Sequence, residues 1–239
     1  MRTLSSMHVS PSPTLRTDTR EGPGSPGPPK GAAVEIPAGS VTLPGQLTAP
    51  NGGGPFVVFA HGSGSSARSP RNARVADALH DGGLGTLLFD LLTAEEDRRR
   101  ANVFDIELLA GRLTAATTWL RAQRVAEGAS IGYFGASTGA AAALRAAAGD
   151  PGIGAVVSRG GRPDLAAGHL HDVRAPTLLI VGGLDPVVLQ LNRRALALMP
   201  FERRLEVVDG ATHLFEEPGT LDSVASMARR WFADHLSWR

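Results

Sequence analysis

The fold of this 239-residue chain is decided by residues 130–139, which read Ser-Ile-Gly-Tyr-Phe-Gly-Ala-Ser-Thr-Gly. An apolar run here leads into a Gly-x-Ser-x-Gly turn, and an alanine-rich segment continues to Gly149. This order predicts a buried strand, a sharp turn and a helix, the setting of a nucleophile elbow. Glycines at 135 and 139 tolerate unusual backbone angles and let the strand and helix approach closely. The five-residue pattern alone is weak evidence, so the rest of the chain must support it.

Strands and helices are predicted to alternate on both sides of this turn. Short, continuously apolar runs indicate strands buried on both faces, and segments with apolar residues at helical spacing separate them. The predicted strands are 33–36, 41–48, 56–60, 86–89, 131–134, 154–157, 177–181 and 204–208. The predicted helices are 72–80, 104–123, 138–148, 187–198 and 221–236. We therefore predict one doubly wound α/β domain with a mostly parallel sheet flanked by helices.

The two ends of this pattern differ in composition. Residues 1–30 are rich in proline, glycine, serine and threonine, so they cannot bury enough apolar surface to offset the entropy of ordering them. We expect a flexible tail over 1–30 and the α/β domain over 31–239. Pro37 and Pro44 are expected to break the first two strands, which predicts that these strands lie at the edge of the sheet.

Bulk composition excludes several classes of function. A net charge of +1 gives no overall basic surface for nucleic acid, and the basic run 98–100 follows an acidic run as in a solvated loop. The absence of cysteine excludes disulfides, thiol catalysis and cysteine-rich zinc sites. No apolar run is long enough for a membrane span, and the N-terminus lacks the apolar core of a signal peptide. We expect a cytoplasmic protein without a nucleic-acid or membrane partner.

Three chemically suited side chains follow successive predicted strands. Ser137 follows the strand 131–134, Asp185 follows 177–181, and His213 follows 204–208. In parallel sheets, functional groups gather at the carboxyl ends of strands, and the order Ser, Asp, His is the one this architecture uses. His213 would take the proton of Ser137 and return it to the leaving group, while Asp185 would hold the imidazole tautomer.

A glycine loop is expected to supply hydrogen-bond donors to the reacting carbonyl group. Residues 61–64, His-Gly-Ser-Gly, end an early strand where backbone N–H groups can face a reacting carbonyl. We predict that the N–H groups of Ser63 and Thr138 form the oxyanion hole, since the second donor normally comes from the residue after the nucleophile.

Other residues compete for each role. Asp90 and Asp164 are alternative acids, but the first precedes the elbow and the second follows it too closely for the usual position. His61 is expected to be structural. His169 and His171 form an H-x-H pair, yet no carboxylate spacing supports a metal site. Taken singly, each predicted triad residue is as well explained by a helix cap or a turn.

Taken together, these segments resemble an α/β-hydrolase. The resemblance is carried by the loop His61–Gly64, the elbow Gly135–Gly139, the segment Leu179–Pro186 and the segment Gly210–His213, and it covers residues from about 33 to 236. More narrowly, the compact chain is similar to dienelactone-hydrolase-like proteins. Members proper of that family carry a cysteine nucleophile, whereas this chain has serine at that place. The resemblance therefore implies carboxylic ester hydrolysis by a serine, without a cofactor or metal.

The spacing after the elbow bears on the substrate. Residues 159–176 leave no room for a large cap, which predicts an open pocket for small or exposed esters. Arg159 and Arg162 lie in this segment, and an arginine can hold a carboxylate through two parallel hydrogen bonds. A salt bridge from Arg162 to Asp164 is the alternative. Lactone, thioester or amide hydrolysis and a non-catalytic binding protein also stay open, as does the oligomeric state; nucleotide binding is disfavoured because the loop lacks a P-loop ending.

Overall fold

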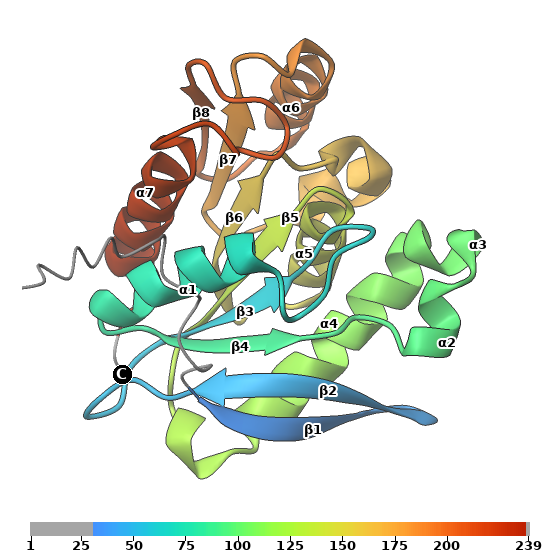
Figure 1. The fold of residues 1–239 in the computed structure, drawn as a ribbon, viewed down its shortest axis with the longest axis vertical. Helices are drawn as coiled ribbons and strands as arrows, with labels where there is room; N and C mark the ends of the chain where they lie inside the picture. Colours follow the sequence, from blue (N-terminus) through green and yellow to red (C-terminus); the bar gives the residue numbers. More distant parts are fainter. Residues whose placement is uncertain (1–30, 238–239) are drawn as a thin grey trace, which may run out of the picture. The chain divides into compact units, whose positions relative to one another are not determined.

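The computed structural model describes residues 31–237, so the tail predicted for residues 1–30 lies outside the described residues. Within 31–237 an eight-stranded sheet has the order β1-β2-β4-β3-β5-β6-β7-β8 (Figure 1). β2 pairs antiparallel with both β1 and β4, and all pairs from β4 to β8 are parallel. The prediction of a doubly wound, mostly parallel sheet is therefore confirmed.

The strands are short and, in the centre of the sheet, continuously apolar. Their bounds are β1 Ala32–Ala38, β2 Val41–Thr48, β3 Phe56–Ala60, β4 Gly85–Phe89, β5 Ile131–Ala136, β6 Ile153–Arg159, β7 Thr177–Gly182 and β8 Arg203–Val208. Every residue of β3, β4, β5 and β7 is buried. This is the pattern of parallel strands covered on both faces.

Helices connect these strands. The α-helices are α1 Pro70–Asp81, α2 Ala94–Asp97, α3 Arg100–Val103, α4 Ile106–Arg121, α5 Thr138–Gly149, α6 Pro186–Leu198 and α7 Thr220–His235, and the 3₁₀ segments are η1 Arg124–Ala126 and η2 Pro163–Asp172. Side-chain caps begin several of them: Ser69 accepts a hydrogen bond at the start of α1, and Asp105 does so at the start of α4. Such caps satisfy amide groups of the first helical turn.

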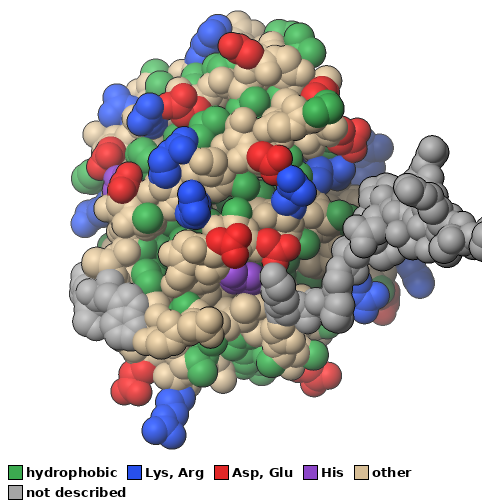
Figure 2. All heavy atoms as spheres, turned by 60° about the vertical axis from the view of Figure 1, so that its left-hand side comes forward, with side chains coloured by type: hydrophobic (Ala, Val, Ile, Leu, Met, Phe, Trp, Pro, Cys, Tyr) green, Lys and Arg blue, Asp and Glu red, His purple; other side chains and the backbone are tan. Residues whose placement is uncertain are grey.

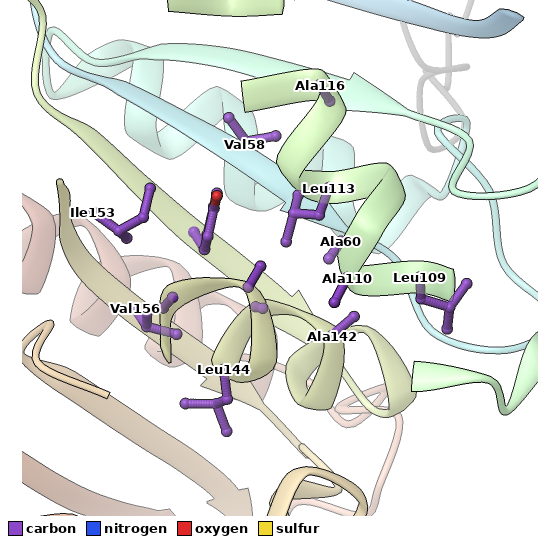
Figure 3. Close-up of a cluster of buried hydrophobic side chains, with 14 of the residues drawn as sticks. Val58, Ala60, Leu109, Ala110, Leu113, Ala116, Ala142, Leu144, Ile153 and Val156 are labelled. Atoms are coloured by element: carbon purple, nitrogen blue, oxygen red, sulfur yellow. The ribbon is translucent and has the colours of Figure 1, made fainter. Parts of the chain in front are cut away.

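The core consists of two apolar clusters, one on each face of the sheet. Val58, Tyr133 and Val156 pack with residues of α4 and α5 on one face (Figure 3). The neighbouring positions of the same strands point the other way, toward α1 and α7. Because successive strand residues alternate between faces, a continuously apolar strand supplies both clusters. Fully burying a large apolar side chain contributes about 1.5–3 kcal/mol, so these clusters dominate the stability of the fold.

The structure differs from the sequence predictions at three places. β1 and β2 run through Pro37 and Pro44 without a break, and of the two only β1 lies at the edge of the sheet, because β2 pairs on both sides. Pro44 lies just before the four β2 residues that pair with β4, and its carbonyl accepts the Asp90 N–H, so its missing N–H does not interrupt that ladder. The mixed-charge segment expected as a loop forms α2 and α3, where Thr93 and Glu96 build a capping box. The segment after β6, for which no helix is predicted, winds into η2.

The described surface is mixed in charge. Figure 2 shows basic and acidic side chains interspersed with apolar ones on the face that carries α1 and α7, without a large area of one sign. Among the helices of residues 31–237, none has both the length and the apolar character that a bilayer crossing requires.

Candidate active site

Ser137 occupies a strained turn between β5 and α5. Its φ of 51° and ψ of −118° are unusual for a residue with a side chain, and such strain tends to gather at functional sites. The flanking glycines are needed for space rather than for positive φ. A Cβ at Gly135 would lie 2.4 Å from the Ala140 Cα, and one at Gly139 would lie 2.1 Å from the Ala60 carbonyl oxygen. The turn thus has the geometry of a nucleophile elbow.

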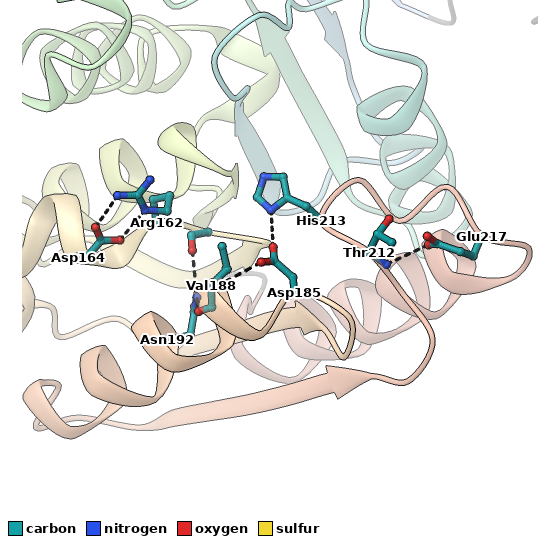
Figure 4. Close-up of polar contacts among 9 residues, drawn as sticks. Arg162, Asp164, Asp185, Val188, Asn192, Thr212, His213 and Glu217 are labelled. Carbon is teal, nitrogen blue, oxygen red and sulfur yellow. Dashed lines mark hydrogen bonds and ion pairs between the residues drawn. The ribbon is translucent and has the colours of Figure 1, made fainter.

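Asp185 and His213 are joined by a short hydrogen bond. His213 Nδ1 lies 2.7 Å from Asp185 Oδ2 (Figure 4). The other carboxylate oxygen accepts the Val188 N–H at 3.3 Å, so Asp185 also caps α6. With the proton on Nδ1, the Nε2 atom of His213 is left as a base. The imidazole is 38% exposed, which leaves it accessible to a substrate.

The end of β6 lies between Ser137 and His213. The Ser137 N–H donates to the Arg159 carbonyl at 3.2 Å. The next residue, Gly160, has φ +52°, and a Cβ there would lie 3.5 Å from His213 Nδ1. Within residues 31–237, Ser137 Oγ makes no hydrogen bond to His213. Catalytic hydrogen bonds are often long in free enzymes and tighten when substrate binds.

Asn192 supports this part of the site, although its place in a helix had no predictive signal. Its buried Nδ2 donates to the Gly161 carbonyl at 2.9 Å and to the Val188 carbonyl at 2.8 Å. These bonds tie α6, whose start is capped by Asp185, to the backbone that follows β6 (Figure 4). The two bonds therefore hold α6 and the segment after β6 in a fixed position relative to each other.

The predicted oxyanion donors meet in an arrangement that the sequence does not indicate. The Ser63 N–H donates to the Thr138 Oγ1 at 2.9 Å, across 75 residues of chain. Thr138 is buried and begins α5, so its own N–H belongs to a helical turn without intrahelical acceptors. The Ser63 N–H is thus already hydrogen-bonded to the Thr138 hydroxyl in this structure.

The competing residues are engaged elsewhere. His61 is buried, with Nδ1 3.0 Å from the Gly62 carbonyl oxygen and Nε2 accepting the Leu91 N–H at 3.0 Å. Asp90 accepts the Ala67 N–H at 2.7 Å. These contacts fasten the glycine loop to the segments that follow β4, which is a structural role.

The two histidines of the H-x-H pair face different carboxylates. His169 lies 3.3 Å from Glu107, and His171 lies 3.3 Å from Asp172. No group of three or more side chains suited to a metal ion occurs within residues 31–237.

The two arginines have opposite surroundings. Arg162 donates to both oxygens of Asp164, at 2.8 and 2.7 Å, and this contact raises its pKa (Figure 4). Arg159 is 8% exposed, and its guanidinium lies 6.0 Å from the centre of the Phe215 ring. Burial, with a smaller contribution from the Arg71 charge, lowers the pKa of Arg159 to about 10. Arg162 is thus paired, whereas Arg159 is a buried cation.

A small cavity adjoins the Ser63 and Thr138 pair. Its volume is about 10 Å³, room for about one water molecule. The remaining lining residues come from the glycine loop, the segments after β4 and α4: His61, Gly62, Leu91, Leu92, Asp97, Val103 and Leu109. A larger cleft of about 430 Å³ lies elsewhere, between the β1–β2 turn and α4, and contains none of the predicted site residues.

The sheet order, the elbow and the Asp185–His213 pair define the class of protein as an α/β-hydrolase. The sequence profile of the dienelactone hydrolase family matches residues 88–238, and the chain belongs to this family. The dienelactone hydrolase of Anabaena variabilis, a solved structure, is 52% identical; the match covers 87% of this chain and 99% of that one, with a TM-score of 0.84. Est1E of Butyrivibrio proteoclasticus shares the fold at 15% identity, with coverage of 86% and 98% and a TM-score of 0.74.

A longer relative carries a different name. A Mycobacterium tuberculosis protein with the provisional name phosphoribosyl transferase is 62% identical over 205 residues. The match covers 85% of this chain but only 46% of the relative. The chain thus spans about half the length of this curated relative.

Proposed function

We propose that this protein is a serine esterase that hydrolyses small carboxylic esters through an acyl-enzyme. The observation that carries the proposal is the 2.7 Å contact between Asp185 and His213. The end of β6 connects this pair to the strained elbow that holds Ser137. Ser137 Oγ attacks the ester carbonyl while His213 Nε2 takes its proton. The imidazolium, stabilised by Asp185, then protonates the leaving alcohol, and water attacks the acyl-enzyme by the same route.

The developing oxyanion is proposed to be stabilised at Thr138 and Ser63. The Thr138 N–H lies in the first turn of α5, where the helix dipole also favours negative charge. The Thr138 hydroxyl accepts the Ser63 N–H, and its own proton has no acceptor within residues 31–237. We infer that this hydroxyl donates to the oxyanion and that Ser63 polarises it.

The sheet order suggests where the two parts of an ester lie. Leu91 and Leu92, beside the small cavity, follow β4 on one side of β5, whereas His213 follows β8 on the other. Because His213 must protonate the leaving alcohol, the acyl group is expected on the β4 side. A cavity of about 10 Å³ there favours a short acyl chain such as acetyl.

Lactone hydrolysis is the second candidate. The observation in its favour is the 52% identity to a protein named dienelactone hydrolase, matched over 99% of its length. A lactone is a cyclic ester and passes through the same tetrahedral intermediate. Thioesters would do the same. The transferase name belongs to a relative of which this chain covers less than half, so it does not define the activity proposed for this chain.

The proposal is tested by labelling and by kinetics. A fluorophosphonate should modify Ser137, located by mass spectrometry, and Ser137→Ala should lose the label together with about 10⁴-fold or more of turnover. Nitrophenyl esters of graded chain length, with lactones and thioesters beside them, define the substrate class. Unlabelled Ser137, or ester hydrolysis that survives in Ser137→Ala, would favour a non-catalytic binding protein or a different nucleophile.

A further inference from the structure

The guanidinium of Arg159 has no counter-charge within residues 31–237. It ends β6 and is 8% exposed, and two of its nitrogens, Nε and one Nη, are buried without a hydrogen-bond partner. No carboxylate lies within ion-pair distance of it in this part of the chain. Buried charges are normally paired, because an unpaired one is costly to remove from water. A guanidinium stays protonated at neutral pH, so Arg159 is an uncompensated cation.

A second arginine increases the positive charge at this place. Arg71 is the second residue of α1, its side chain is 33% exposed, and its Nε is buried without a partner. The positive charge of Arg71 contributes to the lowered pKa of Arg159. The first turn of α1 contains no acidic residue, so the positive end of the helix dipole adds to the two guanidinium groups.

Glu216 partly neutralises the outer arginine. One of its carboxylate oxygens lies 3.1 Å from an Nη of Arg71, and the Glu216 side chain is 63% exposed. Exposed ion pairs of this kind contribute little to stability, so a competing anion can displace Glu216 from Arg71. Glu216 thus shows how a carboxylate or phosphate oxygen would meet Arg71 from solvent.

This positive region adjoins the proposed catalytic residues on the His213 side. The backbone of Arg159 accepts the Ser137 N–H, and the Arg159 guanidinium faces Phe215, two residues beyond His213. Arg159 ends β6, on the β8 side of β5, and the Arg71 side chain reaches the loop after β8 through Glu216, so both guanidinium groups are expected on the side of the leaving alcohol. An anionic group on that alcohol is therefore expected to point toward these two arginines.

We propose that Arg71 and Arg159 bind an anionic group carried by the alcohol part of the substrate. The site suits the oxygens of a carboxylate or a phosphate, because each guanidinium presents a fork of donors. Two arginines and a helix N-terminus match the double charge of a phosphate monoester better than the single charge of a carboxylate. The inference rests on the proposed function for its placement of the alcohol.

The kinetic experiment uses three acetate esters with the same ring: phenyl acetate, 3-acetoxybenzoate and 3-acetoxyphenyl phosphate. The wild-type kcat/KM should be highest for the phosphate and lowest for the neutral ester. Arg159→Gln should lower the phosphate-to-neutral ratio by about 10- to 100-fold, and Arg71→Gln should lower it too. Arg74→Gln is the matched control, since Arg74 lies one turn further along α1 and pairs with Asp222 at the surface. Its ratio should equal that of the wild type.

A binding experiment tests the site without catalysis. Inorganic phosphate should raise the Tm of the wild type and of Arg74→Gln above their values in sodium chloride of equal ionic strength. The rise should be lost in Arg71→Gln. This variant retains Arg159, so the test remains possible if Arg159→Gln does not fold. No phosphate-specific rise, or an equal rise in Arg71→Gln, overturns the inference.

The two proposals fail in different ways. Loss of ester hydrolysis together with a retained, arginine-dependent phosphate effect counts against the esterase and leaves the anion site standing. Ester hydrolysis with the same rate ratio in wild type, Arg71→Gln and Arg159→Gln overturns the anion site alone. A higher rate for 3-acetoxybenzoate than for the phosphate ester identifies carboxylate as the group that is bound and contradicts the phosphate assignment.

Discussion

The Ser63 N–H and the Thr138 hydroxyl are hydrogen-bonded to each other at 2.9 Å, so the two segments expected to stabilise an oxyanion are already in contact. The bond determines which atoms can reach a substrate. While it is formed, the Thr138 N–H and hydroxyl proton are the available donors. The Ser63 N–H acts on the substrate through the hydroxyl.

The first prediction concerns this hydroxyl. Thr138→Val keeps the shape of the side chain and removes the donor, so kcat should fall by about 10- to 100-fold, somewhat less than the loss of a full oxyanion-hole donor. Thr138→Ser should retain most of the turnover, measured with a nitrophenyl acetate. Unchanged or increased turnover in Thr138→Val would mean that Ser63 reaches the oxyanion directly.

The second prediction separates the two roles of Asp185. Asparagine is as good a helix cap as aspartate, so Asp185→Asn should leave the Tm near that of the wild type. The same variant should lose about 10⁴-fold in kcat, because an amide does not hold the imidazole tautomer and carries no charge. Asp185→Ala should lose activity and also about 1 kcal/mol of stability, measured by urea unfolding. Equal losses of stability in Asp185→Asn and Asp185→Ala would show that the missing helix cap does not cause the loss in Asp185→Ala.

The third prediction concerns Gly160, whose φ is +52° and whose position adjoins His213. Gly160→Ala should cost about 1–2 kcal/mol of stability through backbone strain. It should also lower kcat, because the new Cβ would lie 3.2 Å from the His213 carbonyl oxygen and would shift that residue. Gly128→Ala is the control, since Gly128 has φ +72° and open space where an alanine Cβ would lie. Its stability should fall similarly while its kcat stays unchanged. Parallel losses of kcat in the two variants would rule out a specific contact with His213.

The fourth prediction uses Tyr133, which is the single tyrosine of the chain. Burial raises its pKa well above the ordinary value near 10, although the Thr117 hydroxyl, 2.8 Å away, acts in the opposite direction. The folded state therefore keeps the proton longer than the unfolded state, and stability should fall as the pH rises above about 10. Tyrosinate absorbance should be absent from the folded protein up to that pH and should increase only with unfolding. In urea the same group should titrate near 10.

The fifth prediction concerns the acyl cavity. Val103→Ala removes two methyl groups from its wall, so the ratio of kcat/KM for butanoate to that for acetate esters should rise several-fold. Val125→Ala, at an exposed position outside the cavity lining, should leave the ratio unchanged. A rise in both variants would show that the cavity does not select the acyl group.

Local sequence patterns were enough to predict the order of the central strands and helices and the position of the elbow. These features depend on local patterns: a continuously apolar run such as Phe56–Ala60 has few alternatives to a buried strand, and glycines at 135 and 139 permit a close strand–helix crossing. The position of Asp185 and His213 after successive strands also followed from chain order, because the carboxyl ends of parallel strands share one edge. The prediction that Pro37 and Pro44 break their strands was wrong. Whether a proline interrupts a strand depends on whether a neighbouring strand needs its missing N–H, and local composition does not show this.

The contacts between side chains that lie far apart in the chain depend on how the whole domain packs. The tertiary structure joined Asp185 to His213, occupied the Ser63 N–H with Thr138, and paired Arg162 with Asp164 while leaving Arg159 without a counter-charge. No local pattern contains this information, because a hydrogen bond depends on positions within a few tenths of an ångström that packing of the whole domain sets. The sequence predicted which residues are candidates for the chemistry, and the packed fold determined which of their donors and charges lack a partner within residues 31–237.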